Sequence, residues 1–263
     1  MAPRITAVLF DLGDTLWHFP SMPPLDVIRG ETGRRVSKLV KSWGEEVTDQ
    51  RRLLARDIRM EMELETARAF NGDSIDPGYP DICRRVAARH GLKLTPEQGE
   101  EMWEAWNLGG QFLGRTLFPD SLKTLQWLKE RGFRLGCVTN RGYGGPRFHQ
   151  ELRDLGLAEL FEVVAVSCDV GYLKPHPRIF EYALEAMSLA REDTAMVGDS
   201  LRADVEGAKA LGMTAVWRQP PMDEPVEAAE DPPGMEGSVQ PDYTIDSVGE
   251  IRSLPPFADS RSK

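Results

Sequence analysis

The feature that most constrains the fold is a series of short segments that are apolar from end to end. They lie at residues 7–10, 134–139, 162–167, 194–199 and 214–217, and stretches with helical periodicity separate the later ones. A strand that is apolar on both faces needs cover on both faces, which is typical of a parallel sheet flanked by helices. We therefore predict an α/β fold with a parallel sheet and helices on both of its faces.

A long insertion separates the first strand from the others. Residues from about 25 to 108 look helical throughout, and TPEQ at 95–98 has the capping-box pattern of a helix start. Residues 219–241 are rich in proline and acidic residues and poor in aliphatic ones, which predicts a mobile surface loop. The predicted organisation is a core of residues 1–17 and 117–252, a helical cap of residues 18–116, and a tail of residues 253–263.

Composition excludes several classes of protein. The chain has 263 residues and a formal net charge of −10, which disfavours general affinity for nucleic acid or anionic membranes. Cys83, Cys137 and Cys168 are far apart and form no CxxC pair, so we expect three reduced thiols. No segment reaches the length of a membrane span or has the form of a secretory signal. We expect a cytoplasmic protein, and the sequence leaves its oligomeric state open.

Polar side chains stand where these segments end. Asp11 follows the first strand, Thr139 and Asn140 end the second, and Asp199 ends the strand at 194–199. Lys174 precedes a helix start, and Asp204 lies one turn after Asp199. Because the carboxyl ends of parallel strands share one edge of the sheet, we expect these residues to converge there.

The residue types at this edge suit phosphoryl transfer. An aspartate such as Asp11 can attack phosphorus and form an acyl phosphate, which divides one hard step into two. Asp199 and Asp204 could hold or orient Mg²⁺, which prefers oxygen ligands. Lys174 adds a fixed positive charge, and the Thr139 hydroxyl can bind phosphate oxygens.

Four motifs carry a resemblance to a known family. They are FDLGDTL (10–16), VTN (138–140), GYLKPHPRIF (171–180) and GDSLRADVEGAKALGM (198–213), and in this order the chain resembles the haloacid dehalogenase (HAD) superfamily. The resemblance implies a Rossmann-like core with a helical cap inserted after the first motif, and hydrolysis of a small phosphorylated molecule with Mg²⁺.

The resemblance also implies roles for individual residues. Asp11 is expected to be the nucleophile, and Lys174 to steady both the nucleophile and the phosphate. Thr139 and Asn140 are expected at the phosphate. Asp11, Asp199 and the backbone carbonyl of Gly13 are the expected metal ligands, with Asp204 close to the metal.

Gly13 departs from the family pattern. Phosphatases of this family usually have an aspartate there, which protonates the leaving alcohol and then activates water. Glycine keeps the carbonyl but transfers no proton, and general acid–base help is typically worth about 10²–10⁴-fold in rate. Asp14 is a less favoured substitute because its side chain should point elsewhere, and nothing singles out His18 or Arg34 of the inserted region.

The sequence is compatible with three hypotheses of function. The first is a Mg²⁺-dependent phosphatase, slow or selective for good leaving groups. The second is a metal-independent dehalogenase-type hydrolase in which Asp11 displaces halide from carbon, although Asp199 and Asp204 would then lack a cation. The third is a weakly active or non-catalytic protein that binds a phosphorylated ligand or a partner. Cleavage of carbon–phosphorus bonds through Lys38 or Lys41 is permitted but not indicated.

Overall fold

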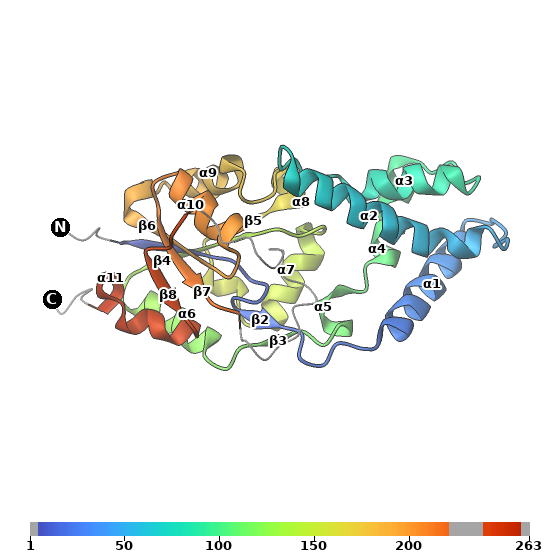
Figure 1. Ribbon diagram of the computed structural model, residues 1–263. Coiled ribbons are helices and arrows are strands. Elements are labelled where there is room, and N and C mark those ends of the chain that lie inside the picture. Colours follow the sequence, from blue (N-terminus) through green and yellow to red (C-terminus); the bar gives the residue numbers. More distant parts are fainter. Residues whose placement is uncertain (1–4, 221–238, 259–263) are drawn as a thin grey trace. The chain divides into compact units, whose positions relative to one another are not determined.

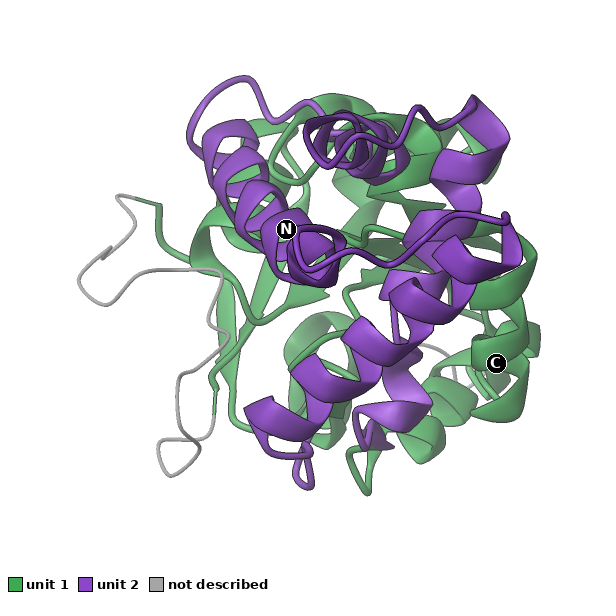
Figure 2. Cartoon of the chain, turned by 90° about the vertical axis from the view of Figure 1, so that its right-hand side faces the viewer, with its two compact units in different colours: residues 1–18, 117–263 green, residues 19–116 purple. Residues whose placement is uncertain are grey.

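The computed structural model describes residues 5–220 and 239–258 of the 263-residue chain. The chain divides into two compact units, unit 1 (Met1–His18 and Leu117–Lys263) and unit 2 (Phe19–Thr116), which Figure 2 colours green and purple. Residues 221–238 of the predicted loop and residues 259–263 of the predicted tail lie outside the described residues.

Unit 1 is built on a six-stranded sheet in which every pairing is parallel. Its order is β5-β4-β1-β6-β7-β8. The strands are β1 (Ala7–Phe10), β4 (Arg134–Thr139), β5 (Val163–Val166), β6 (Thr194–Gly198), β7 (Thr214–Arg218) and β8 (Tyr243–Ile245). The α/β prediction is confirmed, and the strand that comes first in the sequence lies in the middle of the sheet.

Helices cover both faces of this sheet (Figure 1). One face carries α9 (Pro177–Ala186), η4 (Leu201–Glu206) and α10 (Gly207–Ala210), and the other carries α6 (Ser121–Glu130), η5 (Val248–Ser253) and α11 (Pro255–Ala258). The remaining helices of unit 1 are α7 (Gly145–Asp154), η2 (Ala158–Leu160), α8 (Ser167–Val170) and η3 (Arg191–Asp193).

The core under α9 depends on a glycine in β4. A Cβ atom at Gly136 would lie 2.7 Å from Leu9 Cδ2 and 2.8 Å from Met187 Sδ, so only glycine lets the end of α9 pack this closely on β1. Leu9, Ile179 and Phe180 are fully buried in the same cluster. The helical pattern around residues 177–187 therefore lies over the apolar strands, because both need cover.

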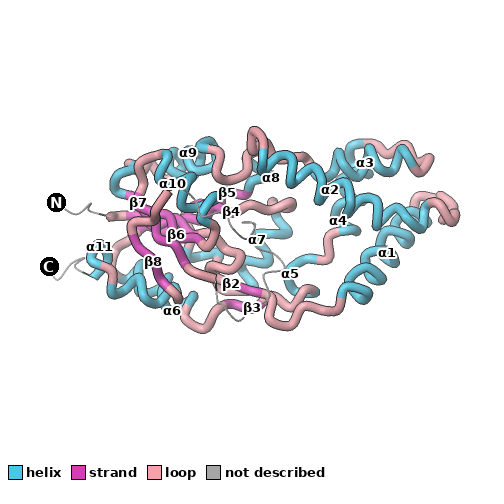
Figure 3. The backbone as a smooth tube through the Cα atoms, viewed as in Figure 1, coloured by secondary structure: helices cyan, strands magenta, loops and turns pink. Residues whose placement is uncertain are grey.

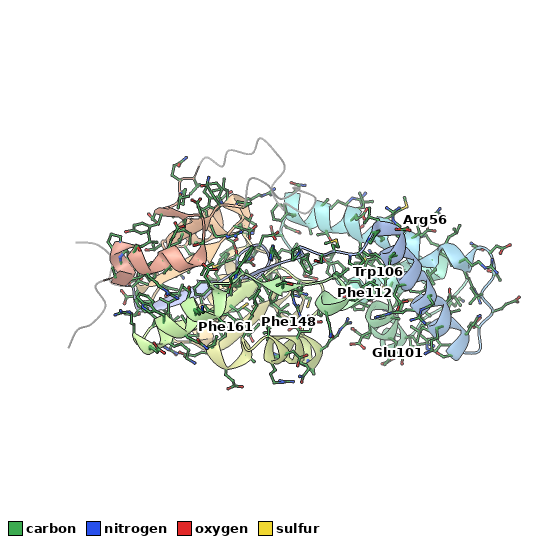
Figure 4. The ribbon with its side chains drawn as sticks, turned by 90° about the horizontal axis from the view of Figure 1, so that it is seen from below. Arg56, Glu101, Trp106, Phe112, Phe148 and Phe161 are labelled. Carbon is green, nitrogen blue, oxygen red and sulfur yellow. The ribbon has the colours of Figure 1, made fainter. Side chains whose placement is uncertain are left out.

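The C-terminal segment differs from the predicted tail. Residues 255–258 form α11, and Phe257 is fully buried against Phe133, with ring centroids 5.7 Å apart. A short segment with one large aromatic residue shows little periodicity, so the sequence pattern does not reveal that this ring completes the core. Figure 4 labels two further aromatic residues of unit 1, Phe148 and Phe161, and both are buried.

The regular structure of unit 2 is almost entirely helical, in contrast to the strands of unit 1 (Figure 3). It contains α1 (Leu25–Ser42), η1 (Arg51–Leu53), α2 (Leu54–Asn71), α3 (Tyr79–Arg89), α4 (Pro96–Trp106) and α5 (Gly109–Phe112). The short strands β2 (Trp17–His18) and β3 (Thr116–Leu117) pair with each other where the chain passes between the units. None of the described helices combines the length and apolar character that crossing a membrane requires.

Local signals explain where the helices of unit 2 form. The capping box predicted before α4 is present, since the Thr95 hydroxyl accepts from Gln98 N and the Gln98 side chain accepts from Thr95 N. Trp103 then stacks between Tyr79 and Trp106, with centroid distances of 5.1 and 5.5 Å. The stack joins α3 to α4, so Trp103 contributes to packing.

A buried histidine connects α3 to the start of α2. His90 Nδ1 lies 2.8 Å from the Gln50 carbonyl oxygen, and His90 Nε2 lies 2.9 Å from Asp57 Oδ2. Both partners are acceptors, so both hydrogen bonds form together only when the imidazole carries two protons. Burial tends to raise the pKa of the Asp57 carboxyl, but hydrogen bonds from Arg56 and His90 outweigh burial and lower that pKa below its usual range.

We expect Asp57→Asn to lower the free energy of unfolding by about 1–3 kcal/mol at pH 7, because a charge-assisted hydrogen bond to His90 is lost. Since the pKa of Asp57 is lowered in the folded state, its contribution is complete above the unfolded-state pKa of about 4. The contribution disappears as the pH falls through the folded-state value. Urea unfolding between pH 3 and pH 7 would measure it.

The matched control is Asp49→Asn, because the Asp49 side chain is 97% exposed and lies 3.5 Å from Arg52. This exposed pair should contribute less than about 1 kcal/mol. Equal losses of stability in the two variants would contradict the role given to Asp57.

Candidate active site

Strand order places three of the predicted residues side by side. Asp11 directly follows β1, Thr139 ends β4 and Asp199 directly follows β6, and β1 lies between β4 and β6. The Asp11 amide donates to the Val197 carbonyl at 2.9 Å, which fixes the start of the Asp11 loop against β6. The carboxyl edge of the sheet therefore brings Asp11 next to residues that are more than a hundred positions away from it in the sequence.

A buried lysine lies between two carboxylates at this edge. Lys174 Nζ is 2.6 Å from Asp11 Oδ1 and 2.7 Å from Asp204 Oδ1, and the Lys174 side chain is 1% exposed. An ammonium group out of contact with water requires such partners, because its desolvation is otherwise very costly. Lys174 thus joins the segment before α9 to the strand β1 and to η4.

The Asn140 side chain positions this lysine. Asn140 Oδ1 accepts from the Lys174 backbone amide at 2.7 Å, and Asn140 Nδ2 donates to the Lys174 carbonyl at 3.1 Å. Both functions of the amide are therefore engaged with the Lys174 backbone. The family resemblance implies Asn140 at the phosphate, which stays a prediction, and the structure shows its side chain holding the Lys174 backbone.

Asp204 reaches the site from η4 because of a glycine. A Cβ atom at Gly198 would lie 2.1 Å from Asp204 Oδ2, so only glycine at this position leaves room for the carboxylate. The Ser200 amide donates to the same oxygen at 3.1 Å. The predicted motif GDS…D therefore works as one unit, in which glycine makes space and the serine amide orients the second acid.

Three carboxylates form one cluster. Oxygen atoms of Asp11, Asp199 and Asp204 all lie within 4.8 Å of one another, and Lys174 is the cation in contact with two of these acids. Three carboxylates and one ammonium leave an excess of two negative charges. Burial raises the pKa of Asp204 to about 6, with Lys174 opposing this rise and Asp11 adding to it. The donor set consists of hard oxygens and carries the charge that a divalent cation would balance, so it fits Mg²⁺.

The Thr139 hydroxyl is available to a ligand. Thr139 is 3% exposed, and its side chain makes no hydrogen bond to any other residue within 5–220 or 239–258. A buried hydroxyl at a strand end usually has a partner. Its position at the same sheet edge suits a group that hydrogen-bonds to an incoming ligand.

Space for a side chain exists at Gly13. A Cβ atom built there would meet no other atom within 4 Å, and Gly13 has no backbone conformation reserved for glycine. Asp14, in contrast, has a positive φ of 46° and an exposed fraction in the intermediate range. The fold therefore does not require glycine at residue 13. The missing side chain affects the chemistry of the site and not its backbone.

Two residues that the sequence reasoning did not single out also shape the site. Thr15 donates from its hydroxyl to Asp199 Oδ1 at 3.1 Å, and Arg218 Nη1 donates to the Asp14 carbonyl at 2.5 Å. Thr15 lies in the first motif, FDLGDTL, and its place in that motif could have indicated a role at the site. Arg218 ends β7, 204 residues from Asp14, and no local pattern indicates its contact.

The remaining side chains with possible chemistry are described by their own contacts and exposure. The His18 ring stacks on Phe118 with a centroid distance of 4.3 Å. Arg34 lies on α1 and forms an ion pair with Glu31 at 2.7 Å. Lys38 and Lys41 are exposed residues of the same helix. The thiol of Cys137 in β4 is buried, which raises its pKa and makes it unsuitable as a nucleophile.

Comparisons with known proteins agree with this geometry. A family model described as haloacid dehalogenase-like hydrolase matches residues 5–212. A phosphoserine phosphatase of Thermus thermophilus is 40% identical over 127 residues, which are 47% of this chain and 48% of that protein. The chain thus matches about half the length of that relative.

Two further matches extend over most of the chain. A glyceraldehyde 3-phosphate phosphatase of Methanopyrus kandleri is 29% identical over 212 residues, covering 81% of this chain and 83% of that protein. The crystal structure of a HAD phosphatase from Thermococcus onnurineus superposes with a TM-score of 0.56 and 26% identity, covering 98% of this chain and 99% of that one. The predicted resemblance to this family is confirmed.

In metal-free protein we expect the wild type to lose stability relative to Asp204→Asn as the pH rises from about 4 to about 6. The pKa of Asp204 is raised in the folded state, so over this pH interval the carboxyl ionises in the unfolded chain but stays largely protonated in the folded one. The free energy of unfolding therefore falls as the pH rises. The expected change is about 1–3 kcal/mol, and urea unfolding in EDTA at a series of pH values would measure it.

Asp154→Asn is the control, because Asp154 is exposed on α7 and its partner is the neutral Gln150. The difference in free energy of unfolding between this variant and the wild type should stay constant over the same pH interval. A pH-independent difference for Asp204→Asn would contradict the raised pKa.

Proposed function

Because the chain belongs to the haloacid dehalogenase-like hydrolases, we propose that it hydrolyses a small-molecule phosphate monoester, with Mg²⁺, through an aspartyl-phosphate on Asp11. The observation that carries the proposal is the cluster of Asp11, Asp199 and Asp204, two of which contact Lys174. The phosphatase names of the relatives support the reaction class. Their different substrates do not single out one for this chain.

The hydrogen bonds at Asp11 suit a nucleophile. Lys174 holds Asp11 Oδ1, and no other residue in the described part of the chain hydrogen-bonds to the Asp11 carboxylate. One oxygen is thus oriented by a charge while Oδ2 keeps its lone pairs for attack on phosphorus. The Asp11 Oδ2–phosphorus bond forms as the bond from phosphorus to the ester oxygen breaks, and the electron pair leaves with the alcohol oxygen.

The other residues would bind and orient the phosphoryl group. The Thr139 hydroxyl would donate to a phosphate oxygen, and the Lys174 ammonium would offset charge at both the carboxylate and the phosphate. Mg²⁺ held by Asp11, Asp199 and the Gly13 carbonyl, with Asp204 beside it, would neutralise charge on the phosphoryl oxygens. Water would then attack phosphorus, releasing inorganic phosphate and regenerating the Asp11 carboxylate.

The surplus of acids favours phosphate over a halogenated substrate. Displacement of halide from carbon by Asp11 needs no divalent cation, and without one the three carboxylates repel each other around a single lysine. A cation shared by these acids and a phosphate removes that repulsion. A catalytic role is favoured over simple binding, because the negative charge of an oriented Asp11 would not increase the affinity of the site for an anion.

We expect turnover of p-nitrophenyl phosphate that requires Mg²⁺ and is lost in EDTA. Asp11→Asn should lower kcat at least about 10³-fold, because the amide is a poor nucleophile. Steady-state assays measure both effects, and Asp154→Asn on α7 should retain wild-type rates.

The alternatives give different results in the same experiment. Release of chloride from 2-chloropropionate without metal would identify a dehalogenase and overturn the proposal. Absence of turnover with either substrate, in protein that still binds phosphate, would identify a binding protein.

We expect Gly13→Asp to raise kcat for an alkyl phosphate by roughly 10²–10⁴-fold, because it supplies the proton that the leaving alkoxide needs. The change should be small for p-nitrophenyl phosphate, whose leaving group needs little protonation. Steady-state kinetics on the two substrates measure this contrast, and the open space at Gly13 makes the substitution compatible with the fold.

Gly13→Asn is the matched control, since it adds a side chain of the same size without a transferable proton. Equal rates for Gly13→Asp and Gly13→Asn on the alkyl ester would show that a missing proton donor does not limit this enzyme.

A further inference from the structure

Unit 2 contains a pocket of its own. Its volume is about 270 Å³, and its walls are formed by α1, by η1 with α2, and by the segment from the end of α4 to Leu113. Its lining combines four arginines with the Trp106 ring and several aliphatic side chains. This volume lies just below the range of about 300–1,000 Å³ that is usual for ligand pockets, so the pocket suits only a small ligand.

The charges around the pocket have one sign. Arg29, Arg52, Arg56 and Arg59 line it, and none of the lining residues is acidic. This concentration of arginine stands out in a chain whose formal net charge is −10. A local cluster of positive charge attracts anions whatever the net charge of the protein.

The arginines are not strongly committed to other partners. Within residues 5–220 and 239–258, no carboxylate forms an ion pair or hydrogen bond with Arg29. Arg52 lies 3.5 Å from Asp49 and Arg59 lies 3.9 Å from Glu63, both carboxylates being well exposed. Exposed pairs of this kind contribute at most about 1 kcal/mol, so a bound anion can replace them. Arg56 is the exception, because its Nε donates to Asp57 at 2.9 Å.

Apart from Thr32 and Asn107, the rest of the wall is apolar, and its aromatic part is held in place. Trp106 Nε1 donates to the Ala55 carbonyl at 2.8 Å, and the Trp106 ring stacks on Trp103. Figure 4 shows Trp106 and Arg56 in the same region of unit 2. Ile28 and Leu108 add aliphatic surface beside the ring. A ligand therefore meets a fixed apolar surface together with guanidinium groups.

We propose that this pocket binds a small organic anion that has an apolar body and a carboxylate, sulfonate or phosphate group. Guanidinium groups bind such anions through paired N–H donors, and the apolar body is buried against Trp106 and its aliphatic neighbours. The site lies entirely within unit 2, on residues separate from the acids and the lysine of the candidate active site.

Binding of naphthalene-2-sulfonate to the full chain tests the proposal. We expect it to shift the indole ¹H–¹⁵N resonance of Trp106 in a saturable manner, with Trp106→Phe assigning that resonance among the six tryptophans. Uncharged 2-naphthol has the same ring system and should bind at least tenfold more weakly. The double variant Arg29→Gln/Arg59→Gln should weaken binding of the sulfonate at least tenfold, because it removes two of the four charges.

The matched control is Arg34→Gln/Arg68→Gln, which removes the same charge from the same two helices outside the pocket. It should bind the sulfonate within about twofold of the wild type. Equal weakening in both double variants, equal binding of sulfonate and naphthol, or no shift of the Trp106 resonance would overturn the proposal. Since the readout is binding, the result is independent of the proposed phosphatase activity.

Discussion

The contact between Lys174 and the carboxylates of Asp11 and Asp204 is the interaction on which the site depends. All three groups are buried, so each charge is tolerated only because the others neutralise it. Asn140 holds the Lys174 backbone, and Gly198 leaves the space through which Asp204 approaches. Loss of the ammonium would leave two acids facing each other without a counter-charge. The same contact joins β1, η4 and the segment before α9, and so ties the sheet edge together.

The loop that carries Asp11 is held from several independent directions. Its start is bonded to β6 through the Asp11 amide. The Asp14 carbonyl accepts from Arg218, whose guanidinium lies 4.0 Å from the centre of the Phe118 ring. The Leu16 carbonyl accepts from the Ser121 hydroxyl at 2.8 Å. A side chain positioned in this way meets a ligand without reorganising. In the proposed phosphatase reaction this positioning would be the protein's main contribution to phosphoryl transfer.

Gly13 shows that orientation and proton transfer are separate properties of the site. The backbone there keeps the carbonyl expected of a metal ligand and has room for a side chain, yet it supplies no acid. An enzyme with this arrangement stabilises the attack on phosphorus more than the departure of a basic alkoxide. The proposed substrate class is therefore restricted by its leaving group as well as by its charge. The arginine-lined pocket of unit 2 is proposed as a separate binding site, and it too would favour anions.

The sequence by itself determined the parallel α/β class, the order of the motifs and the identity of the residues at the sheet edge. Those features follow from local periodicity and from polar residues at strand ends, both of which are written in consecutive positions. Tertiary structure alone decided that Asn140 holds Lys174, that Arg218 anchors Asp14 and that Phe257 completes the core. It also decided that four arginines of unit 2 share one pocket. Arg52, Arg56 and Arg59 share a helical spacing, but their meeting with Arg29 of α1, like the other three contacts, joins separate elements, and no local pattern specifies which of these will meet.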